Sequence, residues 1–302
     1  MPETLIQGGP SPDSLFLDGP PPPWPDWLET ARIDDAVVDA AYENTPAQLR
    51  ASINTGLALA FAHFGQLHQE ADSVTRKPHA GFWFGEHSRA VPWCIIFMDA
   101  TYAAAARLTA ACVLPRLCDV PEIFAVVVGD GKTPPADNVL TALTLSGVED
   151  VFCLQSSGAR KLLEDMAADS AANGIAAPQG RAVLLHNGTL GNLAAASLEY
   201  HIPCFEENTA PGLAVLPESP CTAALLAFAH GNVVPGTGLA PDTQAVFAPA
   251  PPTPQDYTGN AAVAEAVQRG LLVLSPGCEG FWLHRGLEPS FFRVRGLATG
   301  LL

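Results

Sequence analysis

The chain lacks the glycine-rich loops that hold phosphates in most nucleotide-binding proteins. No G-x-G-x-x-G and no G-x-x-x-x-G-K-[ST] motif occurs in its 302 residues. It also has no G-x-S-x-G nucleophile elbow, no C-x-x-C pair and no H-x-x-x-H pair. These absences remove the commonest sequence signals for dinucleotide binding, serine-hydrolase chemistry and zinc coordination.

Basic residues are scarce as well. The chain has 15 Lys and Arg against 31 Asp and Glu, which gives a formal net charge of −16. A nucleic-acid backbone or an anionic membrane would repel such a protein, so neither is expected as a partner. No apolar run is long enough to span a bilayer, and no signal peptide is recognisable, so we expect a cytoplasmic protein.

The remaining composition is that of a globular protein. Hydrophobic residues make up 48% and charged residues 15% of a chain long enough for one large or two ordinary domains. The seven cysteines occur singly, several of them inside apolar runs, where a thiol packs as a small hydrophobic group. We therefore interpret them as core residues.

The first 30 residues form a proline-rich arm. Pro20–Pro23 favours an extended polyproline conformation and excludes a helix there. The arm is interpreted as a loose terminal segment. A docking motif is the alternative, in which the arm is anchored on a neighbouring subunit by Leu15, Phe16, Trp24 and Trp27.

Helical spacing of apolar residues predicts two helices between Ile33 and Glu70. The first ends near Glu43, and Thr45-Pro46 supplies an N-cap followed by proline at the start of the second. His63 and His68 lie beside the apolar stripe and are interpreted as partly exposed helix residues rather than metal ligands.

From Val91 onward, short apolar runs alternate with helical segments. Strands are predicted at Trp93–Phe97, Ile123–Val128, Val151–Leu154, Ala182–Leu185 and Gly212–Leu216. Helices are predicted at Tyr102–Leu117, Ala136–Ser146, Ser157–Ala172, Leu190–Tyr200 and Cys221–His230, and a last helix–strand unit at Ala261–Arg269 and Leu271–Leu274. Such alternation indicates a doubly wound α/β fold with a mostly parallel sheet, which binds ligands at the carboxyl ends of its strands.

One turn of this pattern could bind an anion. The segment His186–Asn192 leaves a predicted strand, carries Gly188 and Gly191, and enters a helix whose N-terminus favours negative charge. An ordinary strand-to-helix turn is the alternative, because Asn-Gly turns are common. Gly129–Lys132 also follows a strand, but Asp130 makes it a poor anion site.

No metal site is proposed strongly by spacing. The candidate ligands are scattered along the chain: His186, His201, His230, His284, Glu206, Glu207, Asp256 and Glu279. Cys278-Glu279 lies between glycines and is interpreted as a turn.

Several segments resemble histidinol dehydrogenases, the NAD- and zinc-dependent enzymes that oxidise histidinol to histidine. "ALTLSGVEDVFCLQSSGA" is similar to the family's "ALxLAGVDEVYxVGGAQA". "APGLAVLPES" takes the place of "GPSEVLVIAD", and "AVFAPAPPTPQDYTGNAAV" that of "AIFLGPYTPEALGDYxAGPNHV". Similar segments follow in the same order from about Ile33 to Arg295, so the resemblance implies a histidinol/aldehyde dehydrogenase-like fold with N-terminal helices and a short C-terminal piece.

The resemblance also assigns residues by position. The glutamine of the family's GGAQA turn falls on Gly158. Its GPGN turn corresponds to His186–Asn192, so the resemblance implies that Asn192 retains the asparagine of that turn. Gly158, Gly188, Gly191 and Asn192 are therefore the candidate positions for a bound NAD.

The family's zinc and catalytic positions are mostly lost. Its metal-binding glutamine and histidine fall on Phe228 and Gly231, and only Asp256 matches a metal ligand. The family's NAD-contacting Tyr-Val-Pro-Gly-Gly stretch is replaced near Cys94–Asp99, and its catalytic Glu-His pair has no counterpart. One carboxylate cannot hold a catalytic zinc, so zinc is not expected and no catalytic residue is assigned.

These observations predict a divergent relative that does not oxidise histidinol and binds a small molecule or a protein partner. The alternative is an NAD(P)-dependent oxidoreductase with another substrate and no zinc. The resemblance further implies a homodimer, which the apolar pairs Phe281-Trp282 and Phe291-Phe292 support. The expected divisions are an arm (1–30), a helical segment (31–90), a Rossmann-like domain (91–216) and a reduced remainder with the tail (217–302).

Overall fold

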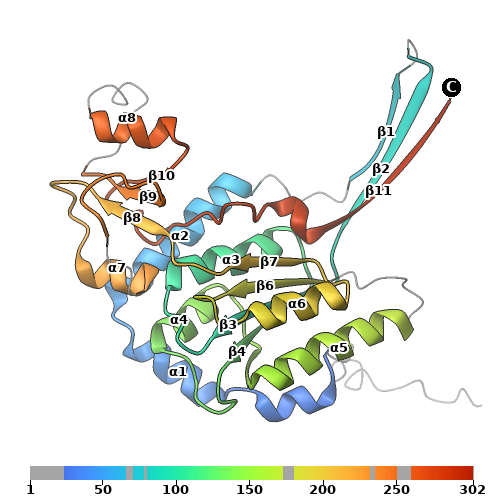
Figure 1. Cartoon of the computed structure of the whole chain (residues 1–302), viewed down its shortest axis with the longest axis horizontal. Coiled ribbons are helices and arrows are strands. Elements are labelled where there is room, and N and C mark those ends of the chain that lie inside the picture. Colours follow the sequence, from blue (N-terminus) through green and yellow to red (C-terminus); the bar gives the residue numbers. More distant parts are fainter. Residues whose placement is uncertain are drawn as a thin grey trace, which may run out of the picture.

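The computed structural model describes residues 24–65, 71–77, 80–172, 180–231, 235–249 and 260–301, with the backbone alone described at 71–77 and 169–172. A central body carries a small lobe on one side and a projecting sheet on the other (Figure 1). In the described part of the chain, no helix is both long and apolar enough to cross a membrane.

A five-stranded parallel sheet forms the centre, in the order β5-β4-β3-β6-β7. Its strands are β3 (Trp93–Asp99), β4 (Glu122–Val128), β5 (Val151–Leu154), β6 (Arg181–Leu185) and β7 (Cys204–Glu207). Every residue of β3 and β5 is buried, as expected of strands covered on both faces. The chain begins the sheet in its middle, at β3, moves outward to β5 and returns to β6. The strand order therefore reverses between β3 and β6, which is where doubly wound proteins bind ligands.

Helices cover both faces of this sheet (Figure 1). One face carries α1 (Asp35–Asn44), α2 (Ala47–Phe64), α3 (Ala105–Leu117) and α4 (Asp137–Leu145). The other carries α5 (Ser156–Ala172), α6 (Gly191–Glu199) and the short 3-10 helix η2 (Asp26–Ala31). Helix α3 is buried at every position except Arg116, because it lies between the sheet and helices α2 and α7.

The doubly wound α/β architecture predicted from the sequence is confirmed. The predicted strands and helices of the central sheet begin and end close to the observed ones. The predicted N-cap of α2 is wrong: Pro46 holds that place without a side-chain cap, and Thr45 ends α1. The Thr45 hydroxyl is buried and bonds the Ala41 carbonyl and the Thr141 hydroxyl, so it joins α1 to α4.

The tryptophans at the end of the proline-rich arm pack within their own chain. Trp24 is buried against Phe124 and Phe152, with ring centroids 5.1 and 5.6 Å away. The Trp27 indole donates to the Asp165 carboxylate at 2.7 Å. Both side chains thus supply apolar cover to the α5 face of their own central sheet. Leu15 and Phe16, the other two residues of the docking alternative, lie outside the described residues.

A second, three-stranded parallel sheet forms the small lobe, in the order β10-β9-β8. It consists of β8 (Gly212–Val215), β9 (Thr243–Phe247) and β10 (Leu272–Leu274), with helices α7 (Ala223–His230) and α8 (Ala261–Gln268). From the sequence, the β8 segment is predicted to be a strand of the central sheet. It pairs instead with β9, since β7 is the last strand of the central sheet.

The third sheet is antiparallel and stands away from the body (Figure 1). It joins β1 (Ala71–Lys77), β2 (Phe82–Ala90) and β11 (Arg293–Leu301) in the order β1-β2-β11. We call it the arm sheet; no element was predicted for its residues. The short helix η5 (Pro289–Phe292) leads into β11, and Phe292 is fully buried at the root.

The aromatic pairs near the C-terminus lie in the chain's own core. Trp282 and Phe292 are buried, and Phe281 and Phe291 are half-buried against neighbouring core residues. They therefore do not form the exposed apolar surface that was taken to support a homodimer.

Candidate functional site at the carboxyl edge of the central sheet

The reversal point between β3 and β6 is held by a carboxylate. Asp99 ends β3, is 4% exposed, and accepts bonds from the Thr101 amide at 2.8 Å and from the Thr101 hydroxyl. Its other oxygen accepts the Asn187 amide from the loop after β6, at 3.3 Å. Asp99 therefore ties the two loops together across the position where a ligand of this fold would enter.

The predicted anion-binding turn is filled by its own histidine. His186 is buried at the end of β6, and its Nδ1 accepts the backbone amides of Gly188 (2.9 Å) and Leu190 (3.1 Å). Since Nδ1 accepts, the proton of the neutral ring sits on Nε2, which donates to Glu206 at 3.0 Å. Together with the Asn187 amide, three donors of the turn are thus used within the protein. The turn is a poor fit for the pyrophosphate of a dinucleotide.

The start of α3 is also covered. The side chain of Asn138 donates to the Ala103 carbonyl at 2.5 Å. Gly231, which follows α7, lies so close that an added Cβ would be 3.6 Å from the Ala103 carbonyl carbon and 3.7 Å from the Ala104 nitrogen. The first helix after the central strand, a frequent phosphate site in doubly wound folds, therefore faces protein atoms.

The four candidate cofactor residues lie on the α5 and α6 side. Asn192, in the first turn of α6, donates to the Ser156 hydroxyl at the start of α5 at 2.7 Å. Gly158 faces the side chain of Leu154, which an added Cβ would meet at 3.5 Å. Gly188 and Gly191 are exposed and have no atoms within 4 Å of an added Cβ. The structure thus brings Asn192 beside the start of α5, and Asp256 lies outside the described residues.

A buried group of charged residues joins the central sheet to the C-terminal segment. Arg107 of α3 forms an ion pair with Glu207 of β7 at 2.7 Å, with the two side chains 4% and 13% exposed. The second oxygen of Glu207 lies 2.9 Å from Nδ1 of His284, and Nε2 of His284 lies 2.7 Å from the Arg107 carbonyl oxygen. Both nitrogens of His284 thus face acceptors, and a ring protonated on both nitrogens satisfies them.

The charges around Glu207 keep it ionised. Burial raises the pKa of Glu207, but the hydrogen bond from His284 and the positive charges of His284 and Arg107 outweigh it, so the pKa lies below its usual value. The Tyr102 hydroxyl adds a longer contact at 3.4 Å. We call Arg107, Glu207 and His284 the buried triad.

His230 lies beside the buried triad. It is fully buried at the end of α7, and its Nε2 donates to the Glu279 carbonyl at 3.1 Å. Burial and the positive charge of Arg107 lower the pKa of His230 to about 3, so the ring is neutral. Among the described residues, His230 Nδ1, Arg107 Nε and Trp282 Nε1 find no hydrogen-bond partner. The junction between the central body and the small lobe is therefore occupied by side chains, and some of their buried polar atoms have no hydrogen-bond partner.

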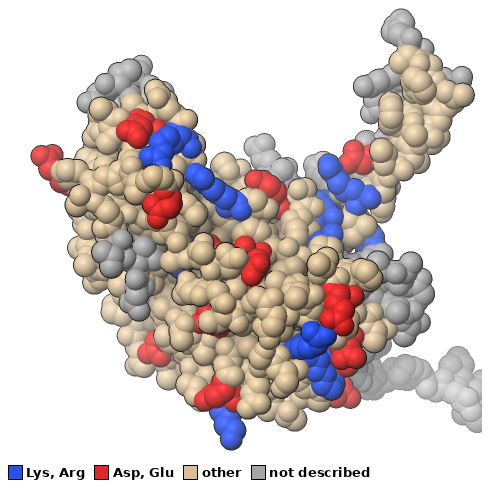
Figure 2. Space-filling model, viewed as in Figure 1, with Lys and Arg blue, Asp and Glu red and all other residues tan. Residues whose placement is uncertain are grey.

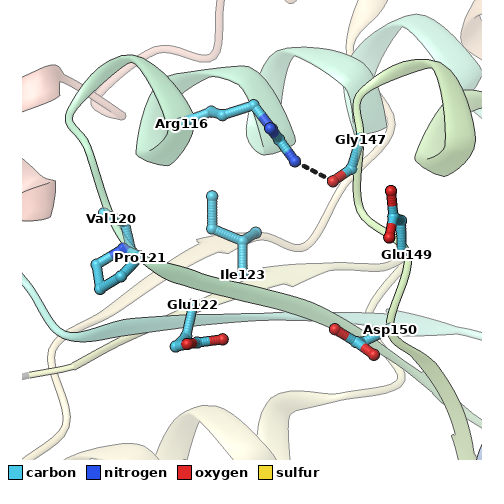
Figure 3. A pocket seen from close by; sticks show the side chains of 8 residues that line it. All are labelled: Arg116, Val120, Pro121, Glu122, Ile123, Gly147, Glu149 and Asp150. Atoms are coloured by element: carbon cyan, nitrogen blue, oxygen red, sulfur yellow. Dashed lines mark hydrogen bonds between the residues drawn. The ribbon is translucent and has the colours of Figure 1, made fainter. Parts of the chain in front are cut away.

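An open cavity of about 230 Å³ lies at the opposite, amino-terminal edge of the sheet (Figure 3). Arg116 donates to the Gly147 carbonyl on its wall, and the lining includes three carboxylates, Glu122, Glu149 and Asp150. Burial and the charge of Asp150 raise the pKa of Glu122. An acidic cavity of this kind repels phosphates, so it does not replace the predicted cofactor site.

The candidate metal ligands separate into pairs. His186 meets Glu206, His284 meets Glu207, and His230 meets only the backbone of Glu279. Within the described ranges, no three His, Cys, Asp or Glu side chains come together as a metal site.

Sequence reasoning missed the two residues that organise this edge, Asp99 and Arg107. Each carried a signal: Asp99 directly follows an apolar run, and Arg107 lies in an alanine-rich, mostly apolar helix. A charge in such a place needs a partner. The partners themselves come from β6, β7 and the C-terminal segment, and only the fold identifies them.

No protein-family model and no curated protein sequence matches the chain. Its structure is similar to that of histidinol dehydrogenase from Elizabethkingia anophelis, with a TM-score of 0.56 and 9% identity over 90% of this chain and 77% of that chain. An aldehyde dehydrogenase from Brucella melitensis biovar abortus 2308 gives a TM-score of 0.34 and 11% identity over 79% of this chain and 56% of that one. Lactaldehyde dehydrogenase from Escherichia coli gives 0.36 and 11% over 76% and 50%. The chain thus has a dehydrogenase-like fold and spans about half the length of the last two proteins.

Proposed function

We propose that this chain is a non-catalytic α/β module that does not oxidise histidinol and acts by binding a protein partner. The observation that carries the proposal is the bonding of the predicted phosphate turn. The Asn187 amide donates to Asp99, and the Gly188 and Leu190 amides donate to His186. A pyrophosphate would have to break these bonds.

Electrostatics support the same conclusion. The Asp99 carboxylate accepts the Asn187 amide of the turn that would have to hold two negative phosphates. Like charges placed so close together repel. The fold retains its apolar core while polar groups close the edge at which related folds hold cofactors. Fold and chemistry have therefore separated in this chain.

A protein partner is favoured over a small ligand, because side chains occupy the junction between the lobes. Arg107, His230, Trp282 and His284 are all buried there. A small ligand would need to displace the buried triad, whose separated charges would then be left in a poorly solvated place. A protein partner requires only the outer surface.

Isothermal titration calorimetry with NAD and with NADP tests the proposal. We expect no heat of binding at millimolar cofactor and no reduced cofactor when histidinol is added. Saturable heat with either dinucleotide would overturn the non-catalytic module.

The alternative function is an NAD(P)-dependent oxidoreductase with an altered substrate. It is supported by the Asn192–Ser156 bond, which brings the N-termini of α5 and α6 together. An Asn192→Asp variant distinguishes the two functions, because it places a negative charge beside the N-termini of α5 and α6, where the cofactor phosphates would bind. Asn192 is exposed, so the change should leave the fold intact. Any cofactor heat seen with the unmodified chain would be abolished by this variant if the cofactor lies there.

A further inference from the structure

The turn after β6 holds a histidine base against a peptide amide. Nδ1 of His186 accepts the backbone amides of Gly188 at 2.9 Å and Leu190 at 3.1 Å, so this nitrogen carries a lone pair and no proton. Nε2 of the same ring donates to the Glu206 carboxylate at 3.0 Å. A carboxylate, an imidazole and an N–H group thus follow one another in hydrogen-bonded order. Enzymes that activate a nucleophile with a base use the same order, and here the group in the place of the nucleophile is the Gly188 nitrogen.

The residue before Gly188 carries a matching electrophile. The side-chain amide carbon of Asn187, Cγ, is linked to the Gly188 nitrogen through the Cβ, Cα and carbonyl carbon of Asn187. A bond between this nitrogen and Cγ closes a succinimide ring, and it requires only rotations within Asn187. Asn187 is exposed, and a Cβ added at Gly188 would meet no atom within 4 Å. The space needed for the ring is therefore open.

The fold fixes the base beside these two residues. His186 is 1% exposed and is bonded through both ring nitrogens, so its orientation is set. On the other side, the Asn187 amide donates to the buried carboxylate of Asp99 at 3.3 Å. A base held in place before the reaction accelerates a proton transfer that an unfolded chain would leave to the solvent.

We propose that Asn187 is a site of self-modification, at which His186 catalyses deamidation of the side chain. The Gly188 nitrogen attacks Cγ of Asn187, and His186 Nδ1 takes the proton of the attacking amide. The bond from Cγ to Nδ2 then breaks, and the same proton passes to Nδ2, which leaves as ammonia. Water opens the succinimide at either ring carbonyl and gives aspartate or isoaspartate at this position. Nothing is oxidised or reduced, and water is the only co-reactant.

The product changes the turn that closes the carboxyl edge. Acidic side chains are already spread over the body in the space-filling view (Figure 2), and deamidation adds one negative charge to the formal −16. The new carboxylate belongs to the residue whose amide Asp99 accepts, so the two carboxylates repel. In isoaspartate the main chain runs through Cβ and Cγ, and this longer path moves the Gly188 amide away from His186. The inference concerns the covalent chemistry of the turn and does not depend on the proposed function.

Peptide mapping by mass spectrometry tests the inference with the full chain. Freshly purified protein is incubated at neutral pH, folded or in concentrated urea, and the mass gain from replacing NH2 by OH is followed at Asn187 over time. The chain has a second Asn-Gly pair, Asn173-Gly174, which gives the rate of the same chemistry in urea. In urea both pairs should react at similar rates. In the folded chain we expect Asn187 to react about 100-fold faster than in urea, the lower end of what a positioned general base contributes.

Two substitutions separate the base from the turn. His186→Gln keeps an acceptor for the Gly188 amide but cannot take its proton, so the folded rate at Asn187 should fall about 100-fold. Glu206→Gln removes the charge behind the imidazole and should slow the folded reaction roughly 10-fold, and Glu206→Asp, which keeps the charge, should restore most of the rate. All three variants should react in urea like the unmodified chain. Circular dichroism and thermal melting check that each variant is folded.

Two outcomes would overturn the inference. The first is an Asn187 that reacts more slowly in the folded chain than in urea, and this comparison requires no variant. It therefore stands even if His186→Gln does not fold. The second is a folded His186→Gln variant that deamidates as fast as the unmodified chain, because the conformation of the turn alone would then account for the reaction.

Discussion

At the scale of single residues, two neighbouring glutamates of β7 have different surroundings. Consecutive residues of a strand point to opposite faces. Glu206 is 30% exposed in its side chain and pairs with His186, whereas Glu207 is 13% exposed and pairs with Arg107 and His284. The same residue type is therefore a partly solvated hydrogen-bond partner of a histidine at one position and the centre of a buried ionic group at the next.

Neutralising Glu207 should be far more costly than neutralising Glu206. Glu207→Gln leaves Arg107 and His284 without a counter-charge in a poorly solvated place, and we expect a loss of about 3–5 kcal/mol in the free energy of unfolding. Glu206→Gln keeps a hydrogen-bond acceptor for His186 and should cost about 1 kcal/mol. Urea unfolding of the two variants at neutral pH measures both values. Equal losses would show that the buried triad does not hold the C-terminal segment.

Single residues were also where sequence reasoning was weakest. It named His186, Glu206, Glu207, His230 and His284 as possible metal ligands, and each of them has a structural partner instead. Residue type and spacing carry no information on which strand ends meet. The turn after β6 was located correctly as a strand-to-helix turn, but its use of His186 as an internal acceptor depends on a ring orientation that no sequence pattern encodes.

At the scale of elements, α2 meets the segment before the C-terminal strand at an unusually close backbone contact. A Cβ at Gly56 would lie 2.0 Å from the Gly280 carbonyl oxygen, and a Cβ at Gly280 would lie 2.0 Å from the Ser52 carbonyl oxygen. Each added Cβ would meet a backbone carbonyl oxygen, which cannot rotate away as a side chain can. The two glycines therefore set the distance between α2 and the C-terminal segment.

Gly56→Ala should destabilise the protein, although alanine in a helix usually stabilises by about 0.5–1 kcal/mol. The added methyl group forces α2 away from Gly280, and overpacking of this kind costs about 1–3 kcal/mol. Gly191→Ala is the matched control at the start of α6, where nothing lies within 4 Å of the added atom, and it should be neutral or slightly stabilising. Thermal melting compares the two. A stabilised Gly56→Ala variant would contradict the close contact.

Elements of the central sheet were predictable because their signals are local. Buried strands such as Val151–Leu154 are continuous apolar runs, and the helices between them have regular apolar spacing. Strand β7 was missed because it is short and ends in two glutamates. The arm sheet was missed for another reason: β2 pairs with β11, about 210 positions further along the chain, so neither strand shows its partner in its own sequence.

At the scale of the whole molecule, two buried groups make stability depend on pH in the same direction. The folded pKa of His230 is lowered to about 3, while the unfolded chain takes up that proton near pH 6.5. Stability is therefore lost as the pH falls from about 6.5 toward 3. The folded pKa of Glu207 is also lowered, so its contribution is present above the unfolded value of about 4.3 and is lost as the pH falls below it. Both groups join the small lobe and the C-terminal segment to the central sheet, so acid should act on this junction first.

The His230→Gln variant separates the two contributions. Glutamine can still donate to the Glu279 carbonyl, but it does not titrate. Between pH 6.5 and 4.5 the unmodified chain should lose up to about 1.4 kcal/mol of unfolding free energy per pH unit more than the variant, which is the slope for one proton taken up on unfolding. Below about pH 4.3 the unfolding free energy should fall with decreasing pH in both proteins, since Glu207 titrates in both. Urea unfolding at half-unit pH steps gives the slopes, and comparing slopes removes the effect of any overall stability difference. Identical slopes between pH 6.5 and 4.5 would mean that His230 is already protonated in the fold, and that the neutral ring assigned to the junction is wrong.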